Sequence, residues 1–186
     1  MTGLPSFLAS LASTFLAMAP LHAAGSLDAL FANPPAAAHP TECMTVISFL
    51  IQPDKSRTFL CDANIADMHG EKIRPYGRGK DAVLLDWEKF ADFATWSLAI
   101  AQPGTYEVIA RVSSARAENE FAVEIAGQHL EGRAPKTASW EEFVEVKLGR
   151  VQIKEPGQLT LAARPSGAAA KWKAIRLASV VLKPAK

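Results

Sequence analysis

The sequence repeats one pattern, and this repeat constrains the fold more than any other feature. Residues 86–111 read DWEKFADFATWSLAIAQPGTYEVIAR, and residues 139–164, which lie 53 positions later, read SWEEFVEVKLGRVQIKEPGQLTLAAR. Each copy has a Trp-Glu-x-Phe start, an apolar run, a Pro-Gly pair and a second alternating segment. The matched positions are Trp87 with Trp140, Glu88 with Glu141, Phe90 with Phe143, Ile100 with Ile153, Pro103-Gly104 with Pro156-Gly157, and Tyr106, Val108, Ala110 and Arg111 with Leu159, Leu161, Ala163 and Arg164.

Each copy predicts a β-hairpin closed at its Pro-Gly pair. Proline suits the first central position of a turn because its φ is already set, and glycine suits the second because a type II turn needs positive φ there. The two copies are either a repeated structural unit or two hairpins whose offset arose by chance. Both interpretations predict an all-β fold.

Short strands are also expected outside the repeat. The expected strands are Met44–Gln52, Arg57–Ile65, Phe93–Ile100, Thr105–Ser113, Glu120–Ala126, Phe143–Ile153, Gln158–Arg164 and Ala174–Leu182, and the segments Glu71–Lys80 and Gln128–Ser139 are expected to be loops. The inward-facing apolar set changes phase at Gly149, which predicts a β-bulge, and it changes phase again after Leu177. About nine strands without an amphipathic helix predict a two-sheet antiparallel β-sandwich.

The N-terminal region has the composition of a secretory leader followed by a linker. Met1–Ala24 is apolar and ends in small residues, which predicts a signal peptide, although no Lys or Arg precedes its apolar core. An uncleaved membrane anchor and a buried helix are the alternatives. Gly25–Pro40 is rich in Ala and Pro and predicts a linker. The folded domain is then 41–186, and the protein is expected to be secreted, periplasmic or in the cell envelope, with no membrane span once the signal is cleaved.

The net charge bears on which partners the protein can bind, and the cysteine count bears on whether it contains a disulfide. The formal net charge is +1, which argues against a nucleic-acid partner because such partners require a clustered basic surface. The two cysteines, Cys43 and Cys61, suggest one disulfide in an exported chain. Pairing of their strands about the turn at 53–56 would place Cys61 nearer to residue 48, so the bridge remains open.

Catalytic signatures are absent from the sequence, and we predict that the protein is not an enzyme. His22 and His39 lie in the leader and linker, while His69 and His129 each stand alone on an expected loop. A small hydrolase would need two carboxylates brought close together in space, and sequence alone does not test for that.

Aromatic residues at expected strand ends are the candidates for ligand binding. An indole face suits the C–H face of a pyranose, and a few polar neighbours would supply hydrogen bonds to hydroxyls. The candidate ligand-binding residues are Trp172, Tyr76, Trp87, Trp140, Asp86 and Arg78, with Glu88 and Lys171 as further polar neighbours. For Trp87 and Trp140 the alternative is a role as packing anchors at the sandwich ends, and Trp172 is the best single candidate.

Several segments of residues 60–184 occur in a recognisable order. They are LCDANIADMHG at 60–70, Trp87 with Asp92 and Trp96, PGTYEV at 103–108, SWEEF at 139–143, LGRV at 148–151, and the closing segment Ile175–Pro184. In these features the chain resembles the carbohydrate-binding modules of the galactose-binding-like jelly-roll class, similar to those attached to secreted fucosidases and sulfatases. The resemblance implies a jelly roll that binds glycans without catalysis, through aromatic residues on the loops at one end.

Two departures from this pattern affect the expected site. Such modules often hold a structural calcium between acidic residues of their first and last strands, but Ala174–Leu182 has no Asp or Glu. We therefore predict no cofactor, and Asp62 is the one metal ligand candidate. The loop Ser166–Lys173 also lacks the Asn or Asp that often binds sugar hydroxyls. The predicted function is an exported glycan-binding protein, and the alternative is a structural or protein-interaction β-sandwich with a partner in the cell envelope.

Overall fold

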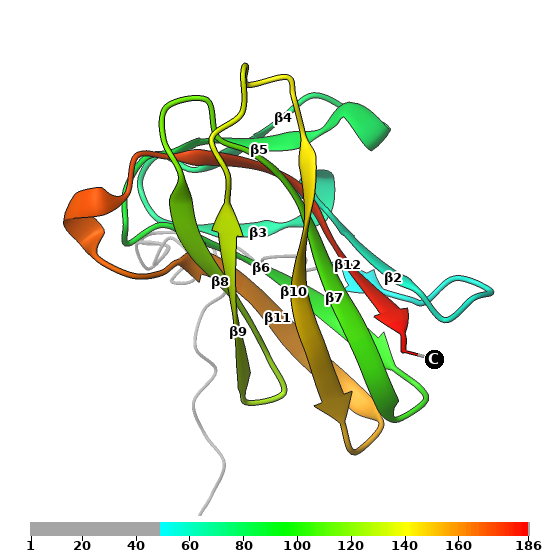
Figure 1. Ribbon diagram of the computed structural model, residues 1–186. Coiled ribbons are helices and arrows are strands. Elements are labelled where there is room, and N and C mark those ends of the chain that lie inside the picture. Colours follow the sequence, from blue (N-terminus) through cyan, green and yellow to red (C-terminus); the bar gives the residue numbers. More distant parts are fainter. Residues whose placement is uncertain (1–48, 186) are drawn as a thin grey trace, which may run out of the picture. The chain divides into compact units, whose positions relative to one another are not determined.

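The chain forms a two-sheet β-sandwich in a computed structural model that describes residues 49–185 (Figure 1). The predicted leader, the linker and Cys43 lie outside the described residues. Twelve strands are present among residues 49–185, more than the nine expected from the sequence. They are β1 Leu50–Ile51, β2 Phe59–Asp62, β3 Asp67–His69, β4 Arg74–Tyr76, β5 Val83–Trp87, β6 Phe93–Ile100, β7 Gly104–Ser113, β8 Asn119–Ile125, β9 Gln128–Ala134, β10 Val144–Ile153, β11 Gly157–Pro165 and β12 Ile175–Pro184, with one-turn 3₁₀ helices η2 Ala63–Ile65, η3 Gly79–Asp81 and η4 Ala169–Lys171.

The strands divide into two six-stranded sheets. The first has the order β1-β6-β11-β8-β9, with β3 also paired to β6. The second has the order β10-β7-β12-β5-β4, with β2 also paired to β12. All pairs are antiparallel except β1 with β6. No helix in residues 49–185 is long and apolar enough to cross a membrane.

The predicted hairpins are instead corners that connect the two sheets. Strand β6 belongs to the first sheet and β7 to the second, and the chain crosses back from β10 to β11. The strand bounds expected from the sequence are close to those observed, but the arms of each unit do not pair with each other. Alternating patterns identify strands without identifying their partners, and this is why the hairpin prediction was wrong.

The two corner units pair with each other around a local pseudo-twofold axis. Strand β10 pairs with β7, and β11 pairs with β6. At the corners, Ile153 lies opposite Gly104 and Gly157 lies opposite Ile100, so the two contacts are related by the same 53-residue offset. The two corners lie side by side at the lower right of Figure 1. The repeat is therefore a structural unit.

The apolar faces of both sheets pack into one core. Its largest fully buried side chains include those of Trp87, Trp96, Phe59 and Phe121. The Trp96 indole donates a hydrogen bond to the Asp62 carbonyl at 2.8 Å, which satisfies its polar atom inside the core. Cys61 is fully buried and forms no disulfide within residues 49–185, and burial raises its pKa because the core disfavours a thiolate.

Both phase changes in the apolar pattern are confirmed as irregularities in pairing. The register of β10 on β7 shifts between Lys147 and Gly149, where Gly149 has φ 125°. The register of β12 shifts between Leu177 and Ser179. Each irregularity restores the inward direction of the next apolar side chain.

Three other expectations about strands and loops were wrong. The segments around β1 and β2 were expected to pair, but they lie in different sheets. The segment 71–80 contains β4, and the expected loop 128–139 contains β9. The less exposed positions of β9 before Ala134 are Gln128, Leu130 and Gly132, and only Leu130 is a large apolar residue, so the apolar alternation is too weak to detect.

Candidate functional site

Three loops meet at one end of the sandwich, and buried polar side chains hold them together. These loops connect β7 to β8, β9 to β10 and β11 to β12. The buried polar residues Ser113, Ser114, Asn119 and Thr137 all lie at this end. Burying polar groups is costly unless they are hydrogen-bonded, so their clustering shows that side-chain hydrogen bonds fix these loops.

Asn119 is the centre of this network. Its Nδ2 donates to Ser114 Oγ at 2.7 Å and to the Ala174 carbonyl at 3.0 Å, and its Oδ1 accepts from the Lys173 N–H at 2.8 Å. The Ser114 N–H donates to Thr137 Oγ1 at 3.1 Å, which adds the third loop. Ala174 has φ 102°, which non-glycine residues rarely adopt, and these hydrogen bonds hold it there.

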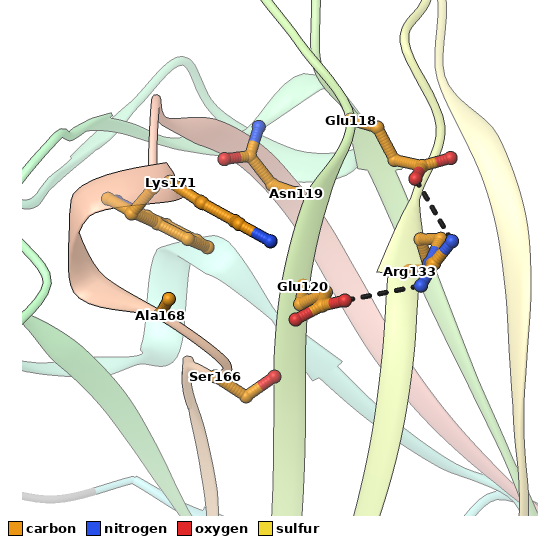
Figure 2. Close-up of a pocket in the computed structure, with 8 residues that line it drawn as sticks. Glu118, Asn119, Glu120, Arg133, Ser166, Ala168 and Lys171 are labelled. Carbon is orange, nitrogen blue, oxygen red and sulfur yellow. Dashed lines mark hydrogen bonds and ion pairs between the residues drawn. The ribbon is translucent and has the colours of Figure 1, made fainter.

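A cavity of about 260 Å³ lies beside this network, and we call it the loop-end cavity (Figure 2). Its lining residues come from the start of β8, the end of β9 and the β11–β12 loop. They are Glu118, Asn119, Glu120, Arg133, Ser166, Ala168, Lys171 and Trp172. Arg133 pairs with Glu118 at 3.1 Å and with Glu120 at 3.2 Å. Figure 2 shows Lys171 extending from its loop across the cavity toward β8.

Trp172 is a buried residue of the cavity lining rather than an exposed aromatic residue on an open loop. Its side chain is buried, and its indole N–H donates to the Trp87 carbonyl at 3.0 Å. The Trp87 and Trp172 rings meet edge to face at 5.9 Å. Trp87 is completely buried and exposes no ring face, which favours its alternative role as a packing anchor.

Trp140 is half-buried beside a second cavity of about 110 Å³, which we call the Trp140 cavity. Asp86 also lines it. The guanidinium of Arg116 lies 5.9 Å and that of Arg176 5.1 Å from the Trp140 ring centroid. The Trp140 indole thus contacts two guanidinium cations, and these contacts contribute cation–π stabilisation.

Acidic residues hold these two arginines in place. Arg116 pairs with Glu88 at 3.0 Å, and Arg176 pairs with Glu141 at 3.3 Å. A hydrogen bond from the Ser139 hydroxyl lowers the pKa of Glu141, and Arg176 lowers it further. A sugar stacking on Trp140 would therefore compete with arginines that are already paired.

The remaining predicted ligand residues do not join the loop-end cavity. Tyr76 and Arg78 are exposed and line neither of the two cavities, and Tyr76 lies on β4 at the edge of the second sheet. Asp86 has φ 55° and pairs with Arg74 at 2.6 Å. The structure thus places Trp172 in one cavity and Trp140 with Asp86 in another, and the aromatic residues do not converge on one surface.

Asp62, the candidate metal ligand, caps a helix in this structure. Its Oδ1 accepts from the Asn64 N–H at 2.9 Å and from Asn64 Nδ2 at 3.0 Å, at the start of η2. Opposite it on β12 lies Ser179, which supplies no carboxylate. Within residues 49–185, no three His, Cys, Asp or Glu side chains gather as a metal site. These residues do not fit a calcium ion held between the first and last strands.

Sequence reasoning missed most of the polar lining of the loop-end cavity. Arg133 belongs to the strand that was expected to be a loop. Asn119 was not singled out because no local pattern marks a buried amide that bonds to distant backbone groups. Glu120 begins one of the expected strands, and its exposed carboxylate borders the cavity in Figure 2. Lys171 was identified as a polar neighbour.

The fold is similar to those of several solved carbohydrate-binding modules. A family 35 carbohydrate-binding module from Clostridium thermocellum matches with a TM-score of 0.56 at 12% identity, over 69% of this chain and 98% of that one. A family 6 module from Clostridium stercorarium in complex with cellobiose matches with a TM-score of 0.50 at 16% identity, over 68% and 93%. Podospora anserina GH26-CBM35 β-(1,4)-mannanase matches at 0.55 and 18% identity, over 69% of this chain and 28% of the mannanase.

The chain spans less than a third of the mannanase, so that match concerns one part of the enzyme. No family model and no curated protein matches the sequence. At these identities the structural matches establish the architecture and leave the ligand open. Residues 49–185 form a jelly-roll β-sandwich whose fold is similar to those of carbohydrate-binding modules.

Proposed function

We propose that this protein binds glycans without catalysis, and that the sugar occupies the loop-end cavity. The observation that carries the proposal is a preorganised cavity lined by an indole and by several hydrogen-bonding groups, in a fold similar to that of carbohydrate-binding modules. Ligand sites combine an apolar wall with a few polar groups in this way. The cavity of about 260 Å³ suits a single sugar unit.

The polar groups around the cavity can bond to hydroxyls in both directions. Glu118 and Glu120 offer acceptors, Arg133 and Lys171 offer donors, and the Ser166 hydroxyl is both. The Asn119 network fixes the loops before a ligand arrives, and this reduces the entropy cost of binding.

We further propose that the protein is exported and acts at the cell surface or outside the cell. The proposal rests on the apolar, small-residue character of Met1–Ala24 and on the Ala/Pro-rich segment that follows it. Mass spectrometry of the protein recovered from the culture medium and from cell fractions tests both the export and the cleavage near residue 24.

Two other functions make different predictions. A protein-interaction sandwich would bind an envelope protein, and sugars would not compete with it. A hydrolase needs carboxylates on opposite sides of a scissile bond. Here Glu118, just before β8, and Glu120, within β8, both approach the Arg133 guanidinium, which does not resemble two carboxylates flanking a bond. Release of reducing ends from polysaccharides would support the hydrolase.

The test is affinity electrophoresis and a glycan array with the purified protein. The panel includes β-1,4-mannan and cellulose oligomers, because a β-(1,4)-mannanase and a module in complex with cellobiose have a similar fold. Galactans are added to widen the panel. We expect retardation by at least one glycan, and Lys171→Ala should weaken it at least about tenfold. Lys154→Ala is the matched control, because Lys154 is an exposed lysine in the β10–β11 connection, away from these loops.

If the folded protein binds no glycan, the proposal is wrong. A pull-down that recovers an envelope protein, with no sugar competing, would favour the interaction function instead.

A further inference from the structure

Another cavity, different from the Trp140 cavity, adjoins the loop-end cavity beside β8 and β9 of the first sheet. We call it the side cavity. It measures about 220 Å³. It shares Glu120, Arg133 and Ser166 with the loop-end cavity and adds Glu131, Gly132 and Gly167. Because three residues border both, the two cavities are adjacent, and the Glu120–Arg133 ion pair lies at their common border. We call them the two lobes of one groove.

The size of each lobe limits what it can hold. Sites for drug-sized ligands begin at about 300 Å³, and each lobe is smaller than this. Each lobe alone therefore suits one small unit, whereas the two together suit two covalently linked units. A chain molecule would use both lobes, and a single sugar would use one.

The side cavity depends on the absence of a side chain at Gly167. This residue has φ 73°, and a Cβ there would lie 2.1 Å from Glu120 Oε2. Any larger residue would push the Glu120 carboxylate out of its place between the lobes. Gly132 serves core packing instead, because a Cβ at this position would lie 2.1 Å from Leu148 Cδ2.

The two lobes also differ in chemistry. The loop-end cavity has the Trp172 indole, and the side cavity has no aromatic residue among its lining residues. Glu131 borders only the side cavity, and its side chain is 79% exposed. The first lobe thus offers an apolar surface with hydrogen bonds, and the second offers hydrogen bonds from charged groups.

We infer that the groove binds two consecutive units of a glycan chain, one in each lobe, rather than a single terminal sugar. The inference rests on the proposed function. It makes Arg133 and Glu120 contacts of both units and Glu131 a contact of the second unit alone. Affinity should therefore depend on chain length with a step between one unit and two.

The test is calorimetric titration of the purified protein with mannose, β-1,4-mannobiose and β-1,4-mannotriose, and with glucose, cellobiose and cellotriose. We expect affinity to rise at least about tenfold from one unit to two in the recognised series, and less than about threefold from two to three. Glu131→Ala should weaken disaccharide binding several-fold and leave monosaccharide binding unchanged. Glu155→Ala, an exposed glutamate between β10 and β11, is the control.

Gly167→Ala provides the second variant and should weaken the binding of both ligands, because it displaces Glu120, which contacts both units. Equal affinity for one and two units would overturn the inference while leaving the proposed function standing. The inference also fails on its own if Glu131→Ala weakens the binding of both ligands equally or of neither. If no sugar of these series or of the array binds, the proposed function fails, and the inference fails with it.

Discussion

The two corner units have the same sequence pattern, but their tryptophans lie in different environments. Trp87 ends β5, which has β12 and β4 as neighbours, and it is completely buried. Trp140 lies in a turn before β10, which is an edge strand, and it is half-buried between two arginines. The pattern therefore specifies the strands of each unit, while the position of the unit in its sheet decides whether the tryptophan is core or surface.

The two arginines that end the units, Arg111 and Arg164, are also matched by the repeat and also lie in different surroundings. Arg111 lies over the Phe143 ring at 5.1 Å, and Arg164 lies over the Phe93 ring at 4.5 Å. Each arginine thus contacts a phenylalanine near the start of the other unit. Arg164 in addition pairs with Glu124 at 3.1 Å. The two arginines occupy matched positions, but their phenylalanine partners do not, because the repeat matches Phe143 with Phe90.

The largest difference should appear between the two tryptophans. Trp87→Ala should lower the free energy of unfolding by about 3–5 kcal/mol, because it empties a buried site and removes the edge-to-face contact with Trp172. Trp140→Ala should cost about 1 kcal/mol or less, because the ring is partly exposed. Urea unfolding followed by circular dichroism measures both.

Trp87→Phe and Trp140→Phe give the same comparison if Trp87→Ala does not fold. Equal losses at the two positions would contradict the assignment of one tryptophan to the core and the other to the surface.

The two corner glycines should behave alike. Gly104 and Gly157 have φ 159° and 150°, where side chains are strained, and a Cβ would meet no close contact at either position. Alanine at either site should therefore lower the free energy of unfolding by about 1 kcal/mol through backbone strain alone. Thermal and urea unfolding of Gly104→Ala and Gly157→Ala test this, and a cost at only one corner would break the pseudo-twofold relation.

The smallest effects are expected from the arginines. Arg164→Gln should cost about 1 kcal/mol, because it removes a cation–π contact and a partly exposed ion pair. Arg111→Gln should cost less than about 0.5 kcal/mol, because its side chain is exposed. In urea unfolding at about 1 M salt the difference should narrow, because salt screens the Arg164–Glu124 pair. A larger loss for Arg111→Gln would reverse the predicted order.

Local sequence rules predicted the class of fold and much of its detail. Alternation located β6, β7, β10 and β11 within one or two residues, and the phase change located the bulge at Gly149. Strand partners could not be read from the pattern, because a strand that pairs across a corner has the same alternation as one that pairs in a hairpin. The Ala126-Gly127 turn into β9 was missed as a hairpin, although both residues have positive φ.

The candidate site was less predictable than the fold. Trp172 was identified, but its hydrogen bond to the Trp87 carbonyl spans 85 residues. Asn119 reaches Ala174, 55 residues away, and Arg133 comes from a strand with weak alternation. Such sites depend on which loops meet in space, and a single sequence does not contain that information in local form.

Indole N–H resonances in a ¹⁵N-labelled protein test the central claim most directly, which is that the loop-end cavity binds sugar. Titration with a glycan from the binding panel should shift the Trp172 Nε1–H signal and the backbone signals of Glu118, Glu120 and Ser166. The Trp140 Nε1–H signal should stay in place, because its ring contacts Arg116 and Arg176 outside this cavity. Shifts at Trp140 with none at Trp172 or its neighbours would contradict the claim, and so would the absence of any shift.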